Sequence, residues 1–350
     1  MRLILAALVI VCHAWYLAGA GEGPHPAGEN LGGWAVIGFF IVSGYLITGS
    51  RMAKGFGQYL TNRIARLYPG FAVNLLVTVG LFAPLAYVLA HHTLDGYFHT
   101  PTTPLAYLAN NFTLRIGTYD VAGTLAGVPY PGAWNGSLWT LYYEFLCYLA
   151  VGVVFSLAWL RRRPRVVAPV LFLGSVLVYS QVDRVMALAQ DNFDLRFFLK
   201  LLPSFLAGAV LWAFRDRLVY NLVGAVLSAG ASAGLIAVST RWGIQAASPF
   251  LGYIILWLAM AVPAPRLILR EDISYGVYIY GWITEQLLAL AGAYRLGLVP
   301  YMILALIGTV PFAVASWLLV EKPAMRRARG QTAYPWLRRR RPITAPGAVP

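Results

Sequence analysis

Apolar residues form ten long runs along the chain, separated by polar segments rich in Pro, Gly or charged residues. A helix crosses the hydrocarbon layer of a membrane, about 30 Å thick, in about 20 residues, so runs of this length predict spanning helices. The predicted spans are residues 3–20, 34–50, 68–90, 137–160, 166–182, 197–214, 217–238, 246–263, 273–293 and 299–320. The pattern therefore predicts an all-α, polytopic membrane protein with about ten transmembrane helices.

The composition excludes the other broad classes. Of the 350 residues, 59% are hydrophobic and 11% are charged, whereas a soluble domain carries about 25% charged residues. A disordered chain would have far fewer apolar and aromatic residues. The five His and two Cys show no metal-ligand spacing, so we expect no metal site.

The charge is strongly positive, with 27 Lys and Arg against 13 Asp and Glu. In a soluble protein this excess would indicate a nucleic-acid partner, but in a membrane protein Lys and Arg gather in cytoplasmic loops. With the N-terminus inside, 21 of the 27 basic residues fall on the cytoplasmic side of the ten predicted spans. We therefore predict that both termini are cytoplasmic, and the charge requires no nucleic acid.

The apolar run at the N-terminus and the basic segment at the C-terminus each have a specific interpretation. The first apolar run, followed by Ala18-Gly19-Ala20, is also compatible with a secretory signal peptide, although a His inside the run is unusual for one. We expect one transmembrane domain over residues 1–325 and a cytoplasmic tail over 326–350, basic at first, then Pro-rich and disordered.

The longest segment between predicted spans, residues 91–136, lies outside in this arrangement. Its aromatic residues suit either stacking on sugar rings or an aromatic belt at the lipid headgroups, and both interpretations remain open. These residues include Tyr97, Tyr107, Tyr119, Tyr130 and Trp134.

Ionisable residues inside membrane spans are costly, so each is a candidate functional residue. His13 follows Arg2 by eleven residues, which places it about 16 Å above the cytoplasmic boundary, and Glu144 is expected at a similar depth in the fourth span. A carboxylate beside a His can fix its tautomer and stabilise its charged form, so the two residues are a candidate acid–base pair. The structural alternatives are a buried Glu144 bonded to its neighbours and a His13 that hydrogen-bonds across helices.

Two arginines, Arg63 and Arg66, are three residues apart on the cytoplasmic side and would share one face of a helix. Because the guanidinium group suits phosphate, they are candidates to bind a phosphorylated cofactor. The alternative is an ordinary positive-inside anchor that also contacts anionic lipid.

Six segments in the same order resemble the acyltransferase-3 family of bacterial membrane O-acyltransferases. The first is an Arg and a His separated by ten residues in the first span, here Arg2 and His13. The others are FFIVSGYLI at 39–47, RIARLYP at 63–69, SLWTLYYE at 137–144, DISYGVYIY at 272–280 and EKP at 321–323. Many members carry a His after the fifth segment, where this chain has Gly281, so we assign no second catalytic His.

The resemblance implies a multi-pass enzyme of the bacterial inner membrane that moves an acyl group, usually acetyl, from cytoplasmic acyl-CoA to a sugar or glycan hydroxyl. His13 would be the general base, supported by Glu144, while Arg63 and Arg66, helped by Arg2, would bind the CoA phosphates. Acyl-CoA would be a co-substrate, and no permanently bound cofactor is expected. The implied partners are membrane lipids, an acceptor that can be lipid-linked, and glycan-assembly proteins.

Two other functions fit the same residues. A transporter or flippase would use His13 and Glu144 as a proton relay, whereas a structural subunit of a glycan-assembly complex would need neither residue for chemistry. Release of CoA thiol that depends on an acceptor sugar distinguishes the enzyme from both.

Overall fold

The computed structural model describes residues 1–263 and 271–330, and this part of the chain is helical, with no strand. Two π-helical turns, η2 (Thr78–Phe82) and η4 (Trp317–Glu321), join successive helices into longer rods. The main helices are α1 (Arg2–Leu17), α2 (Leu31–Ala53), α3 (Phe56–Val77), α4 (Ala83–His91), α6 (Thr140–Val154), α8 (Pro164–Ser180), α10 (Phe193–Ala213), α11 (Leu222–Val238), α12 (Gly243–Ala261), α14 (Ser274–Leu290), α15 (Leu298–Ser316) and α16 (Lys322–Ala328). The shorter ones are η1 (Pro26–Gly28), α5 (Pro104–Asn111), α7 (Ala158–Arg161), α9 (Val182–Leu188) and η3 (Ala293–Leu296).

Each of the ten predicted spans overlaps one of the main helices, which confirms the all-α class. Within the described residues, five helices are long and apolar enough to cross a membrane, and a sixth is added if α8 and α9, bent by 73°, count as one span. Helices α1, α6 and α11 are apolar but shorter than 18 residues. The protein is therefore a helical membrane protein, while the count of ten spans and the cytoplasmic termini stay predictions. The predicted tail lies outside the described residues from 331 onward, and α16 crosses the predicted domain boundary at 325.

The third predicted span begins later than the helix that contains it. Helix α3 begins at Phe56, twelve residues before the predicted start at 68. Residues 56–67 are too polar to resemble a span, but Tyr59, Asn62 and Arg66 recur at helical spacing and are all buried. Contacts with other helices therefore stabilise this polar stretch as a helix.

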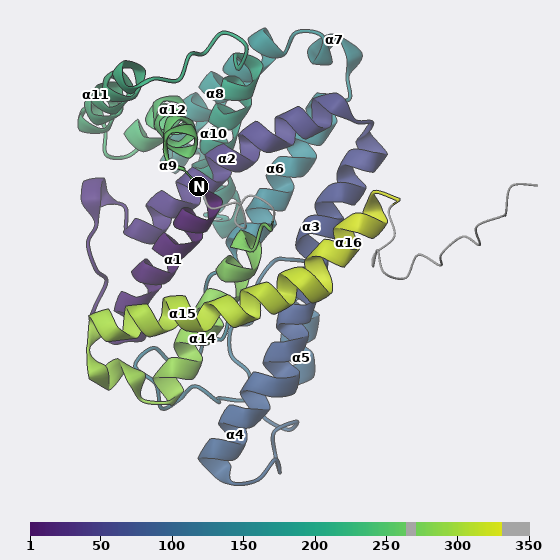
Figure 1. The fold of residues 1–350 in the computed structure, drawn as a ribbon, viewed down its shortest axis with the longest axis vertical. Coiled ribbons are helices and arrows are strands. Elements are labelled where there is room, and N and C mark those ends of the chain that lie inside the picture. The colour runs from purple at the N-terminus through teal and green to yellow at the C-terminus, as the bar shows by residue number, and fades with distance from the viewer. Residues whose placement is uncertain (264–270, 331–350) are drawn as a thin grey trace, which may run out of the picture.

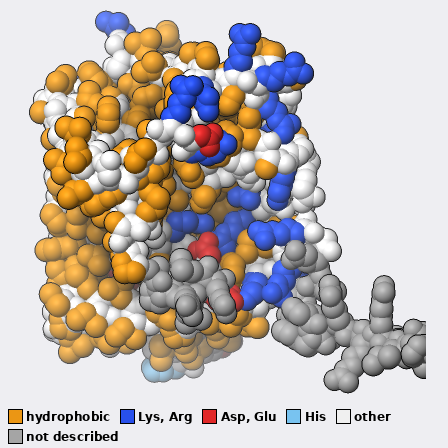
Figure 2. Space-filling model, turned by 45° about the horizontal axis from the view of Figure 1, so that its top comes forward, with side chains coloured by type: hydrophobic (Ala, Val, Ile, Leu, Met, Phe, Trp, Pro, Cys, Tyr) orange, Lys and Arg blue, Asp and Glu red, His pale blue; other side chains and the backbone are white. Residues whose placement is uncertain are grey.

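Helices from distant parts of the chain surround the interior. Helix α1 contacts α2, α14 and α15, and α2 also packs against α6 and α10. In Figure 1 the rod of α15 and α16 crosses the front of the molecule, α3 and α4 run along its length, and α11 and α12 lie at the upper end. Figure 2 shows Lys and Arg side chains gathered on part of one face, beside a wide hydrophobic surface suited to lipid.

Glycines allow α2 and α10 to approach closely. A Cβ atom at Gly44 would overlap the backbone oxygen of Phe205, and one at Gly208 would overlap the backbone oxygen of Ile41. Small residues at such crossings let helix backbones touch, which is how helices associate in a membrane. This contact fixes the position of α10, which supplies one wall of the site.

The aromatic residues of the 91–136 segment separate into two groups. Tyr97, Tyr107 and Trp134 are buried in the core, so they are not available to stack on a ligand. Tyr119 and Tyr130 stay partly exposed, and Tyr130 borders the cavity that contains His13.

Candidate active site

Three adjoining cavities lie in a line inside the helical bundle. We name them the arginine cavity, about 250 Å³, the neck, about 20 Å³, and the histidine cavity, about 330 Å³. Arg2 borders both the arginine cavity and the neck, while Val36, Thr140 and Tyr278 border both the neck and the histidine cavity. The shared lining residues therefore place the three spaces next to one another. The other lining residues that identify them are Arg63, Arg66, Asp272 and Arg329 in the arginine cavity, Glu144 in the neck, and His13 in the histidine cavity.

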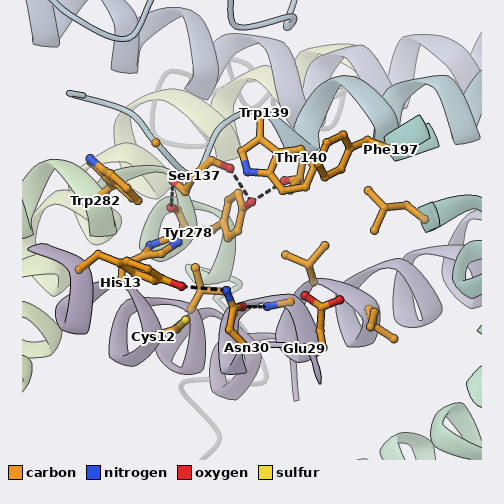
Figure 3. Close-up of a pocket in the computed structure, with 18 of the residues that line it drawn as sticks. Cys12, His13, Glu29, Asn30, Ser137, Trp139, Thr140, Phe197, Tyr278 and Trp282 are labelled. Atoms are coloured by element: carbon orange, nitrogen blue, oxygen red, sulfur yellow. Dashed lines mark hydrogen bonds between the residues drawn. The ribbon is translucent and has the colours of Figure 1, made fainter. Parts of the chain in front are cut away.

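His13 lies in the last turns of α1, at the wall of the histidine cavity (Figure 3). Its ring meets the Trp282 ring edge to face, with 4.7 Å between the ring centres. The Trp282 indole N–H in turn donates to the backbone oxygen of Ala133 at 2.7 Å. Trp282 is therefore fixed by the segment before α6, and it positions the imidazole from one side.

The start of α2 forms another edge of the histidine cavity. Asn30 caps this helix, because its Oδ1 accepts from the backbone N–H of Gly33 at 2.7 Å. The same side chain donates to the Tyr16 hydroxyl at 3.1 Å, which links α2 to the end of α1. The cap thus aligns the two helices that carry His13 and its neighbours.

Tyr278 of α14 stands between the neck and the histidine cavity. Its hydroxyl donates to the backbone oxygen of Ser137 at 2.7 Å and also bonds to Thr140. In Figure 3 these bonds join Tyr278 to Ser137 in the segment before α6 and to Thr140, the first residue of that helix. Tyr278 therefore occupies the passage through which a ligand in the neck would reach His13.

The structure does not bring Glu144 and His13 together. Glu144 lines the neck beside Arg2, and it accepts hydrogen bonds from Ser43 at 2.6 Å and from Tyr148 at 2.5 Å. Within residues 1–263 and 271–330, no hydrogen bond or ion pair joins it to His13. In α6, Thr140 is the residue that reaches the histidine cavity, and Glu144 lies one turn, about 5.4 Å, further in. Depth along a helix does not specify the direction of the side chain, so the predicted pairing does not follow from similar depths.

The arginine cavity carries a strong positive charge. Four arginines, at positions 2, 63, 66 and 329, line it together with one acidic residue, Asp272. Burial tends to raise the pKa of Asp272, but Arg2 and Arg66 outweigh this effect and keep the pKa below its ordinary value. The aspartate is therefore ionised, and the cavity keeps an excess of positive charge that suits a polyanion.

Arg63 and Arg66 lie on one face of α3, as their spacing predicts, but their surroundings differ. Arg66 is buried, with Nη2 at 2.7 Å from Asp272 and Nη1 at 3.1 Å from Glu321, whose side chain is fully buried. For Arg63 the described part of the chain provides no ion pair. Arg66 therefore joins three distant segments, while Arg63 lines the cavity without an ion pair to any described residue.

Arg2 shares the acidic partner of Arg66. Its Nη1 lies 3.2 Å from Asp272 Oδ2, so Asp272 ties the start of α1 to α3. This ion pair fixes the first turn of the helix that carries His13. The Arg and His of the first span thus occupy the two ends of the line of cavities.

The motifs and spacings predict no role for several charged residues that line these cavities or pair with a residue that does. Asp272 and Glu321 stand in the family-like segments, but their ion pairs to Arg66 span 206 and 255 residues and leave no local pattern. Glu29 precedes α2, Arg329 belongs to a basic run at the end of α16, and Lys200 lies inside α10, and a charge at any of these places is unremarkable without the fold. In the sequence, these three residues are notable only because each lies near the predicted boundary of a span or outside the span.

Comparison with known proteins identifies the family. A family model described as an acyltransferase domain matches residues 1–318, so the chain belongs to the acyltransferase-3 family, and the resemblance predicted from its motifs is confirmed. An O-acetyl transferase of Shigella phage Sf6 is 28% identical over 93% of this chain and 95% of its own length. Nodulation protein 10 of Rhizobium leguminosarum bv. viciae is 28% identical over 93% of this chain and 92% of its own. No solved structure matches. The protein is thus a membrane O-acyltransferase.

Proposed function

We propose that the protein transfers an acetyl group from acetyl-CoA to a hydroxyl of a sugar or exported glycan in the bacterial inner membrane. The observation that carries this proposal is the line of cavities from four arginines to His13. Arg63 and Arg329, which have no ion pair within the described residues, would bind the CoA phosphates, because guanidinium groups bond phosphate oxygens in pairs. Arg2 and Arg66, which are paired with acidic residues, would add to the positive charge around them. Arg2 and His13 are eleven residues apart on α1, about 16 Å, a distance that the extended pantetheine arm can cover.

The chemistry at His13 needs one proton acceptor. The neutral imidazole takes the proton of the sugar hydroxyl as the oxygen attacks the thioester carbonyl carbon. The C–S bond then breaks, and the imidazolium returns its proton to the departing CoA thiolate. His13 ends neutral, so no permanently bound cofactor or metal is required.

The neck must widen for this reaction. Its volume of about 20 Å³ has room for little more than one water molecule. Phe39 and Tyr278 meet edge to face there, with ring centres 5.6 Å apart, and we propose that they separate when the arm enters. Glu144 would act at the boundary between the neck and the arginine cavity, through its hydrogen bonds to Ser43 and Tyr148 of the arginine cavity, rather than on His13.

A proton relay for transport has less support than acyl transfer. Such a relay would need His13 and Glu144 in contact, whereas they line different cavities. The arginine cavity also has no evident use in a relay.

The direct test of the proposed function supplies radiolabelled acetyl-CoA to the cytoplasmic face of membrane vesicles that contain the host envelope glycan. We expect acetyl label in the glycan and one CoA thiol released for each acetyl group transferred. Vesicles in which the glycan stays unlabelled, or in which the glycan moves across the membrane without CoA release, would contradict the proposal.

Removing a cation from the arginine cavity should weaken donor binding without stopping the chemistry. A charge-assisted hydrogen bond is worth about 1.5 to 3 kcal/mol, so Arg63→Ala and Arg329→Ala should each raise the KM for acetyl-CoA about tenfold or more. Arg329 lies on the cavity because Gln58 of α3 bonds the backbone oxygen of Ala328 at 2.9 Å. CoA-release kinetics measure the effect.

The control for the donor-binding prediction is Arg327→Ala, because Arg327 is exposed on the same short helix and does not line the cavity. S-acetylpantetheine, which lacks the phosphates, should react equally well with the two cavity variants and the wild type. An unchanged KM for acetyl-CoA in both cavity variants would assign these arginines to membrane anchoring instead.

A further inference from the structure

The two large cavities differ in charge. Within residues 1–263 and 271–330, four cations and one acidic residue line the arginine cavity, whereas one of each, Lys200 and Glu29, lines the histidine cavity together with His13. Glu29 Oε2 lies 2.6 Å from Lys200 Nζ, so the two charges neutralise each other. Among the residues that the structure describes, the histidine cavity therefore has no unpaired Lys or Arg to offer an anionic ligand.

The Glu29–Lys200 pair is built into the fold. Glu29 precedes the Asn30 cap and folds back over the first turn of α2, where a Cβ at Gly33 would collide with its carboxylate. Lys200 reaches the cavity from α10. Their side chains are 17% and 31% exposed, so both are held at the wall yet can be reached from the cavity.

The rest of the wall combines flat aromatic faces with uncharged polar groups. Tyr130, Trp139 and Trp282 contribute rings, and Trp139 and Phe197 lie across the cavity from Glu29 and Asn30 (Figure 3). The cavity volume of about 330 Å³ is near the small end of the range for ligand sites, about 300 to 1,000 Å³. Such walls suit a pyranose ring, which has an apolar face and a rim of hydroxyls.

We propose that the sugar presented to His13 is uncharged and that the Glu29–Lys200 pair selects it, which rests on the proposed function. Neighbouring hydroxyls of a neutral sugar can donate to Glu29 and accept from Lys200 without separating the pair. A sugar with a carboxylate or phosphate would have to lose its hydration beside Glu29, while Lys200 is already neutralised. The pair therefore acts as a specificity determinant for the acceptor.

The test uses two acceptors of the same shape, methyl β-D-glucoside and methyl β-D-glucuronide, with radiolabelled acetyl-CoA and the purified full-length enzyme in lipid nanodiscs. The quantity measured is the ratio of kcat/KM for the glucoside to that for the glucuronide. The wild type should favour the glucoside at least tenfold. Glu29→Gln leaves Lys200 unpaired and should lower the ratio about tenfold, while Lys200→Met leaves Glu29 unpaired and should raise it.

The double variant Glu29→Gln/Lys200→Met removes both charges and should return the ratio towards that of the wild type. Glu22→Gln is the control, since Glu22 is an exposed acid outside the cavity. Equal use of the two glycosides by the wild type, or single variants that move the ratio in the same direction or not at all, would overturn the proposal. So would failure to label either glycoside by enzyme that still labels the envelope glycan. If the envelope glycan also stays unlabelled, the proposed function itself fails.

Discussion

Replacing His13 by alanine is expected to lower acetyl transfer by about 10² to 10⁴-fold, the range that a positioned general base contributes. The reason is geometric, because within the described residues His13 is the only histidine that borders the line of cavities. Transfer of radiolabel from acetyl-CoA to the envelope glycan measures the effect. Binding of CoA should be unchanged, since the arginine cavity lies at the other end of α1.

The matched control for His13→Ala is His25→Ala. His25 lies in the loop before α2, where its Nδ1 is 3.0 Å from the backbone oxygen of Gly23, and it does not line the cavity. It should keep full activity. Equal labelling by His13→Ala and the wild type would remove His13 from the chemistry.

Replacing Arg66 by alanine should have the largest effect on stability, about 3 to 5 kcal/mol, as expected when one partner of a buried ion pair is removed. Glu321 has no exposed surface and would lose its cation, and Asp272 would keep only Arg2. The loss should appear as a much lower Tm of the detergent-solubilised protein and a smaller yield of inserted protein.

Two further variants separate the stability effect of Arg66 from a loss of charge alone. Arg63→Ala removes a neighbouring cation with no described ion pair, so its Tm should stay near that of the wild type. Arg66→Met/Glu321→Gln removes both partners, which costs less than leaving one buried charge, and should recover part of the Tm. If Arg66→Ala is as stable as Arg63→Ala, Arg66 does not have the structural role described above.

The hydrophobic pattern predicted the order of the helices well, because each membrane helix must carry its own apolar run. The hydrophobic pattern failed where contacts with other helices determine the local structure. Residues 56–67 lie outside the predicted span, yet they form the start of α3 because Tyr59 bonds the backbone of α6 and Arg66 pairs with acidic residues. The sequence records the apolar length of a segment and not the partners that bury its polar face.

The site was predictable in parts. The spacing of Arg2 and His13 placed them at opposite ends of one helix, and the structure gives each a cavity of its own. The pairing of His13 with Glu144 could not be deduced, because equal depth leaves the rotation of both helices open. The different surroundings of Arg63 and Arg66 could not be predicted either, because the acidic partners of Arg66 come from the far end of the chain.

In the proposed reaction, the acyl group of the donor travels from the arginine cavity through the neck to His13. The most direct measurement uses a CoA thioester whose short acyl chain carries a diazirine, irradiated with the enzyme and followed by mass spectrometry of the labelled peptides. We predict label on the part of α1 around His13 or on Tyr278 and Trp282 of α14, removed by excess acetyl-CoA. Label confined to α3 and α16, or to the lipid-facing helix α11, would contradict the claim.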